Sequence, residues 1–170
     1  MQLGSFFYLC HSILKKQVLL LLLIVFTITA CRQNVVINQY HVIPDETWNY
    51  EFVIKDTFSI YNPDFYHQTY ANLRINGDYP YSNIHLKYTI IAPDSTSKTE
   101  KVTIKLAEKD GKWIGTGLGN IITYQTPVLD RDIFKQTGTY TVKLEQYMRL
   151  ENLPDVISAG IKVEKQEEIF

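Results

Sequence analysis

The chain has little cysteine, since only Cys10 and Cys31 occur among its 170 residues. The sequence after residue 31 therefore contains no thiol, which excludes a disulfide framework and a cysteine nucleophile for the main part of the chain. The chain also lacks an excess of basic residues, with 17 Lys and Arg against 18 Asp and Glu. This charge balance offers no electrostatic basis for binding nucleic acid, so we expect no nucleic-acid partner.

The sequence has no apolar run long enough for a simple transmembrane helix. A membrane-spanning helix needs about 20 apolar residues, and the apolar run at residues 18–30 is shorter. Lys15 and Lys16 precede this run, and the first 30 residues contain no acid. Basic residues, then a short apolar run, then small residues are the layout of a secretory signal. Residues 1–30 are therefore predicted to be an export signal.

The end of this signal, Ile28-Thr29-Ala30-Cys31, resembles a bacterial lipobox. Small residues before the cysteine would let signal peptidase II cleave between Ala30 and Cys31, and the thiol can carry a diacylglyceryl group as a thioether. Cys31 would become the new N-terminus, and fatty acyl chains such as palmitate would anchor it to a membrane. The alternative is an uncleaved anchor in which Cys31 is an ordinary small residue. Cleavage would remove only two charged residues, both lysines, and leave a net charge of −3.

Alternation of apolar and polar residues dominates the rest of the chain, which is long enough for one domain. Period-two alternation places successive side chains on opposite faces of a strand. It is clearest in KVTIKLAE and recurs where Ile84, Leu86, Tyr88 and Ile90 alternate with polar residues, and these four are predicted to face inward. Similar segments lie at residues 52–60, 71–75, 102–106, 140–144 and 161–163. One polar face on each strand is typical of antiparallel sheets.

Turn sequences separate these segments, among them NGDYPY, APDSTS, KDGK and QTGT. Gly111 in KDGK can adopt the positive φ that tight hairpin turns require. We therefore predict an all-β fold, a single antiparallel β-sandwich (Ig-like or jelly-roll-like) at residues 41–170. Residues 31–40 are expected to be the lipidated N-terminus and linker, although residues 35–37 could instead pair as an edge strand.

Residue patterns typical of catalysis or metal binding are missing from the sequence. His41, His67 and His85 lie far apart and show none of the spacings of zinc ligands. No G-x-S-x-G motif occurs. The sequence GTGLGN at residues 115–120 lacks the spacing and the following helix of a phosphate-binding loop, so we expect a strand crossing or bulge there. We expect no enzyme activity, no metal, no nucleotide, and no cofactor beyond the covalent lipid on Cys31.

Tyrosine is abundant, with 12 residues in the chain, and several lie close together at residues 60–70 and 78–83. Tyrosine offers rigid amphipathic contact area and is common at recognition surfaces. Tyr66, Tyr79 and Tyr81 could form such a surface or could cap the end of the sandwich. Trp113 could be a core anchor or a binding platform. The candidate docking surface predicted from the sequence consists of Asp78, Tyr79, Pro80, Tyr81 and Trp113.

Four separated segments, in this order behind the lipobox, resemble the gliding-motility lipoprotein H (GldH) family of Bacteroidetes: DYPYSNIHLKYTIIAPDS, EKDGKWIGTGLGN, GTYTVKLEQYMR and LPDVISAGIKVEK. The resemblance spans about residues 31–165. It implies a non-enzymatic cell-envelope lipoprotein, an accessory component of gliding motility and of the type IX secretion machinery. No catalytic residues are known for the family, so Cys31 is the only residue whose role carries over.

The residues after Cys31, RQNVV, bear on where the protein is located. Acidic residues just after the cysteine resemble the signal that exports lipoproteins of these bacteria to the cell surface. No acid follows Cys31 closely, which favours an outer-membrane lipoprotein that faces the periplasm.

Two kinds of function fit these features. In the first, loops at residues 77–83 and 109–120 dock onto other envelope proteins of the motility or secretion machinery. In the second, the protein is a glycan-binding surface lipoprotein in which tyrosines and Trp113 stack on sugar rings. Exposed coplanar aromatic rings in a groove would favour glycan binding, whereas an exposed apolar patch would favour docking.

Overall fold

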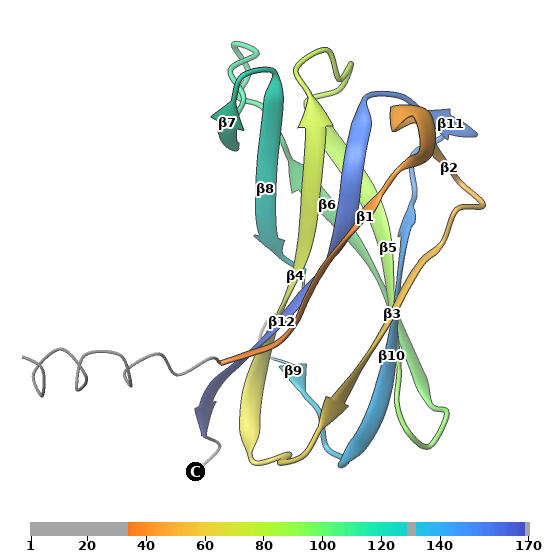
Figure 1. The fold of residues 1–170 in the computed structure, drawn as a ribbon, viewed down its shortest axis with the longest axis vertical. Coiled ribbons are helices and arrows are strands. Elements are labelled where there is room, and N and C mark those ends of the chain that lie inside the picture. The colour runs from red at the N-terminus through yellow and green to blue at the C-terminus, as the bar shows by residue number, and fades with distance from the viewer. Residues whose placement is uncertain (1–33, 129–131, 169–170) are drawn as a thin grey trace, which may run out of the picture. The chain divides into compact units, whose positions relative to one another are not determined.

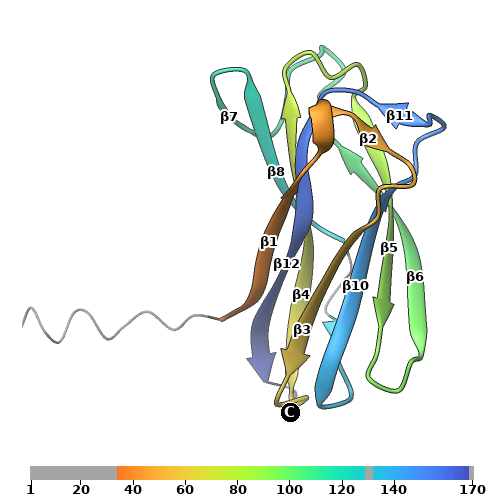
Figure 2. The same cartoon turned by 45° about the vertical axis from the view of Figure 1, so that its right-hand side comes forward.

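The computed structural model describes residues 34–128 and 132–168, which form two facing layers of β-strands (Figures 1 and 2). A short 3-10 turn, η2 (Pro44–Glu46), interrupts them. The strands of the described residues are β1 (Val35–Val42), β2 (Trp48–Asn49), β3 (Ile54–Ile60), β4 (Phe65–Asn76), β5 (Asn83–Ile91), β6 (Ser97–Lys105), β7 (Thr116–Leu118), β8 (Ile121–Pro127), β9 (Asp132–Ile133), β10 (Gly138–Gln146), β11 (Asn152–Leu153) and β12 (Val156–Glu168).

All strand pairs in the described part of the chain are antiparallel. One sheet has the order β1-β12-β4-β8-β7, with β9 also pairing with β4, and the second has the order β3-β10-β5-β6. Strands β2 and β11 form a small separate ladder. The predicted antiparallel β-sandwich is therefore confirmed. No helix in the described residues is long and apolar enough to cross a bilayer.

The alternating segments place their apolar residues between the two sheets, as predicted. Ile84, Leu86 and Tyr88 of β5 are buried, and so are the apolar residues of β4, β10 and β12 at residues 71–75, 140–144 and 161–163. Gly111 adopts a φ of 85°, and its N–H donates to the Glu108 carbonyl at 3.0 Å, which closes the predicted turn in KDGK. Burial of one face of each sheet is the main source of stability in such a fold.

The first strand corrects the predicted boundary between linker and domain. Val35–Val42 forms β1, which pairs with β12 from Val35 opposite Glu164 to Val42 opposite Ser158. The linker interpretation is therefore wrong for residues 35–40, and the alternative of an edge strand is correct and extends to residue 42. The strand was difficult to predict because its sequence, VVINQYHV, does not alternate cleanly and its side chains are only partly buried.

Phe52 also departs from its predicted inward position. It precedes β3, and its side chain is exposed, whereas Trp48 is fully buried. The Trp48 indole N–H donates to the Phe52 carbonyl at 2.9 Å. The main chain of Phe52 is thus fixed to the core while its ring points outward. A period-two pattern in the sequence cannot distinguish this exposed position from a buried one.

Candidate functional site

Four connections gather at one end of the sandwich, here called the distal end. They are residues 43–53, 77–82, 106–120 and 147–155 (Figure 1). The strand register places them together, because Ile75 near the end of β4 lies opposite both Val156 of β12 and Ile122 of β8. Val35 lies at the opposite end of β1 from these loops. Both loops that the sequence predicted for docking therefore lie at the distal end.

Tyr79 does not belong to an exposed surface, which corrects its place among the candidate docking residues. Its side chain is only 3% exposed, and its hydroxyl donates to the Asn83 carbonyl at 3.3 Å. Burial raises the pKa of the Tyr79 hydroxyl far above its ordinary value. Of the two predicted roles, capping the end of the sandwich is the one that Tyr79 performs.

The two distal loops are joined to each other through Asn76, Gly77 and Asn120. The Gly77 N–H donates to the Asn120 carbonyl at 2.8 Å, and the Asn120 side-chain amide donates to Asn76 Oδ1 at 2.5 Å. A Cβ on Gly77 would lie 2.2 Å from Asn120 Oδ1, so glycine permits this close approach. The two loops are thus held together by hydrogen bonds.

The remaining predicted residues are more accessible. Tyr81 is 36% exposed, Asp78 and Pro80 are exposed, and Trp113 is half-buried. The Tyr79 ring meets Tyr81 at an interplanar angle of 77° and Trp113 at 58°. The three rings therefore do not lie in one plane.

Sequence reasoning missed the turn after β10, residues 147–150. Tyr81, Met148 and Leu150 line a pocket of about 410 Å³ there, and Met148 and Leu150 continue into a second pocket of about 400 Å³ beside Tyr50 and Tyr147. We define the distal apolar surface as Tyr50, Tyr81, Tyr147, Met148 and Leu150. Met148 is partly buried, and the other four are 36% to 51% exposed. The sequence signal for this surface was the pair of apolar residues Met148 and Leu150, which directly follow the end of the alternating strand.

Buried Gln146 holds this turn in place. Its side-chain amide donates to the Leu150 carbonyl at 2.8 Å, and its Oε1 accepts the Met148 N–H at 2.8 Å. On the exposed side, Lys101 Nζ donates to the Tyr147 hydroxyl at 2.8 Å, and this hydrogen bond lowers the pKa of Tyr147. The apolar side chains of the turn are therefore presented on a fixed backbone.

The other residues singled out from the sequence do not come together. His41, His67 and His85 lie on β1, β4 and β5, and no group of three or more His, Cys, Asp or Glu side chains gathers in residues 34–128 and 132–168. Residues 116–118 of GTGLGN form β7 against β8. Ala30 and Cys31, the predicted cleavage and lipidation site, lie outside the described residues.

The fold and this site define the class of protein. It is a β-sandwich protein that carries an apolar surface among the loops at the end of the domain away from Val35. The sequence model of the family described as GldH lipoprotein matches residues 35–163. The chain therefore belongs to the GldH lipoprotein family.

Two curated relatives are similar over most of their length. The chain is 25% identical over 157 residues to a gliding motility lipoprotein GldH homolog of Christiangramia forsetii. The aligned region covers 84% of this chain and 93% of the relative. The chain is also 23% identical over 155 residues to the gliding motility lipoprotein GldH of Flavobacterium johnsoniae. Here the aligned region covers 87% of this chain and 96% of the relative.

Proposed function

We propose that this protein is a lipid-anchored component of a gliding-motility apparatus that acts by docking onto other envelope proteins through the distal apolar surface. The observation that carries the proposal is an exposed group of large apolar side chains, centred on Met148 and Leu150, at the end of the domain away from Val35. Exposed apolar patches rimmed by polar groups are typical of interaction sites. Lys87 and Glu145 supply such a rim, with Nζ and Oε1 3.0 Å apart.

The shape of the aromatic cluster favours docking over glycan binding. The candidate platform of Tyr79, Tyr81 and Trp113 has one ring in the core and the other two inclined to it. Tyrosine and methionine are enriched at protein interfaces, where they supply contact area with few polar groups left unpaired.

The names of the two relatives support a place in gliding motility. The lipobox at Cys31 supports anchoring to the outer membrane by acyl chains. We assign this docking protein a non-enzymatic accessory role that is connected with type IX secretion.

The test is recovery of partners from the native envelope. Tyr81→Ser combined with Leu150→Ser removes two exposed apolar side chains without opening the core. After chemical crosslinking in cells, purification of the variant should recover at least about tenfold less of its envelope partners than the unaltered protein, because a few central apolar residues carry most interface energy.

Tyr61→Ser is the matched control, since Tyr61 is the most exposed tyrosine outside the distal end, at 89%. It should leave partner recovery unchanged. Equal recovery of the same partners by the double variant and the unaltered protein would show that docking does not use this surface.

A further inference from the structure

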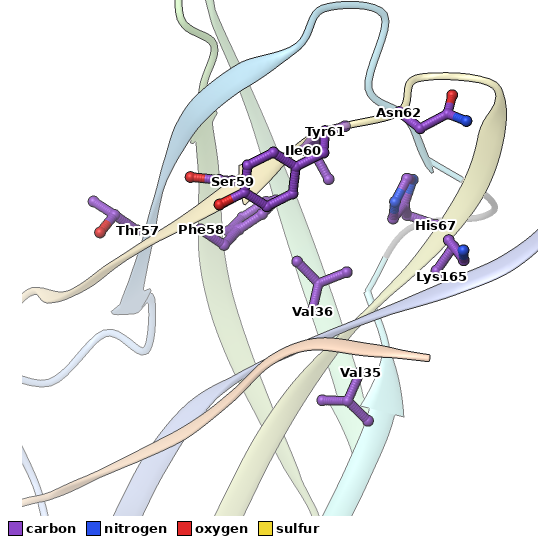
Figure 3. Close-up of a pocket in the computed structure, with 10 residues that line it drawn as sticks. All are labelled: Val35, Val36, Thr57, Phe58, Ser59, Ile60, Tyr61, Asn62, His67 and Lys165. Atoms are coloured by element: carbon purple, nitrogen blue, oxygen red, sulfur yellow. The ribbon is translucent and has the colours of Figure 1, made fainter. Parts of the chain in front are cut away.

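A pocket of about 550 Å³ opens between the edges of the two main sheets, at the end of the domain where β1 begins (Figure 3). Nearer the distal end, His41 of β1 pairs with Asp56 of β3 at 2.9 Å, which joins the two edges. The pocket lies beyond this contact, between residues 35–36 of β1 and residues 57–62. Its volume falls within the range of about 300–1,000 Å³ that is usual for small-molecule sites.

The floor of this pocket is apolar. Phe58 and Ile60 belong to the buried core of the sandwich, and Val36 is partly buried against it. Val36 extends from β1 toward the side chains of β3, whereas Val35 points to the other side of its strand (Figure 3). Such a floor can accept a hydrocarbon chain, because it removes apolar ligand surface from water.

His67 adds an unpaired polar atom to the pocket. Its side chain is only 2% exposed, and its Nδ1 has no hydrogen-bond partner in the described residues. Buried polar atoms nearly always have a partner, so a water or a ligand atom is expected at Nδ1. The Phe134 ring packs edge-on against the imidazole at 5.1 Å and fixes its position. Burial lowers the pKa of His67, a hydrogen bond to the Phe65 backbone raises it, and the nearby Lys165 charge lowers it further.

Lys165 supplies a positive charge at the same pocket. Its Nζ lies 4.0 Å from the centroid of the Phe65 ring, and no carboxylate of the described residues forms an ion pair with it. Lys162, three residues earlier, pairs with Glu164 instead. A lysine outside the ion pairs of the described residues, an imidazole nitrogen without a hydrogen-bond partner among them and an apolar floor thus share one cavity.

We propose that this pocket binds a single-chain amphiphile with an anionic head, whose chain lies on Phe58 and Ile60 and whose carboxylate or phosphate lies between Lys165 and His67 Nδ1. Lys165 would pair with the anion, and the imidazole would donate its N–H.

The lipobox cysteine precedes Val35 by only four residues, which span at most about 14 Å. The short tether would therefore keep the pocket close to a bilayer, the source of such ligands. Docking at the distal end is a separate property, so either proposal can fail alone.

Photocrosslinking of the full lipidated chain tests this site. The protein is reconstituted in phosphatidylcholine vesicles with palmitate that carries a photoreactive diazirine, irradiated, and digested for mass spectrometry. Labels are expected on residues 35–36 and 57–62. Lys165→Gln should reduce this labelling about tenfold through loss of the charge-assisted contact. Lys98→Gln is the matched control, because it removes a lysine on β6 and should leave labelling unchanged.

A second variant, Val36→Phe, fills the pocket without changing its charge and should also reduce the labelling. Labelling that Lys165→Gln and Val36→Phe both leave intact would overturn the site. Suppression by inorganic phosphate as effective as that by unlabelled palmitate would mean that the pocket takes a free anion, and it would overturn the amphiphile. A several-fold rise of labelling in a Cys31→Ser chain would show that the protein's own acyl chain fills the pocket, which would also contradict the proposal.

Discussion

Buried tyrosines in this domain bring their hydroxyls to backbone carbonyls. Tyr124 donates to the Leu106 carbonyl at 2.8 Å, and Tyr140 donates to the Gln136 carbonyl at 3.0 Å. Burial raises the pKa of Tyr124 to about 12. Tyr79 follows the same pattern through Asn83. These three tyrosines can therefore contribute to the core, because each of their hydroxyls finds an acceptor.

This pattern predicts opposite roles for the two neighbouring tyrosines of the 77–82 loop. Tyr79→Ala should lower the free energy of unfolding by about 3–5 kcal/mol, the usual cost of deleting a buried aromatic ring. Tyr79→Phe should cost about 1 kcal/mol, because it removes only the hydrogen bond to Asn83. Urea unfolding followed by tryptophan fluorescence measures both.

Tyr81→Ala is the control for these variants, because Tyr81 is partly exposed and its loss should cost less than about 1 kcal/mol. If Tyr79→Ala and Tyr81→Ala destabilised the domain equally, Tyr79 would not be the buried cap of the sandwich.

At the scale of secondary-structure elements, β1 depends on one glycine of its neighbour. A Cβ placed on Gly160 of β12 would lie 2.0 Å from the Gln39 carbonyl oxygen and 2.9 Å from Tyr40 Cα. These are backbone atoms, so they cannot rotate away as a side chain could. The close approach of β1 to β12 therefore requires glycine at position 160.

Gly160→Ala should displace β1 and lower the free energy of unfolding by about 1–3 kcal/mol, the typical cost of overpacking. Amide hydrogen exchange should accelerate at residues 37–42 while β5 and β10 stay protected. The matched control is Gly117→Ala, whose Cβ would lie an ordinary 3.7 Å from the Ile121 carbonyl oxygen. Unchanged protection of β1 in Gly160→Ala would contradict this account of the contact.

The elements differ in how far their sequences reveal them. The strands around Ile84, Leu73 and Val142 were predictable because apolar residues that face the core alternate with polar residues, which gives a period of two. β1 was not, because an edge strand with partly buried side chains carries no such period. The turn at Met148 and Leu150 was also missed, since Gln146 fixes it through contacts with backbone atoms that leave no pattern in the side chains. Tyr79 was ambiguous because the same residue type serves cores and surfaces.

At the scale of the whole molecule, the described domain has Val35 at one end of β1 and the distal loops at the other. β1 has 8 residues and therefore spans roughly 26 Å, which approximates the separation between Val35 and the distal loops. A protein anchored at Cys31 would present the distal apolar surface away from its membrane. This arrangement suits a protein that reaches other components across a compartment.

The proposed location on the periplasmic side of the outer membrane can be tested directly. No acid occurs between Cys31 and Asp45, so we expect protease added to intact cells to leave the protein uncut, and protease added after outer-membrane permeabilisation to degrade it. The double variant Gln33→Glu, Asn34→Asp introduces acids after the cysteine and should become cleavable in intact cells. Cleavage of the unaltered protein in intact cells would overturn the periplasmic orientation.

The pairing of β1 with β12 also determines how this domain would respond to a mechanical pull. A force applied between the N-terminal end and a partner held at the distal loops would act along the axis of β1. The hydrogen bonds from Ile37 opposite Val163 to Val42 opposite Ser158 run across that direction. They would be sheared together rather than opened one after another, so the load would be shared along the strand. The edge strand that carries the weakest sequence signal is thus the one through which tension would enter the fold.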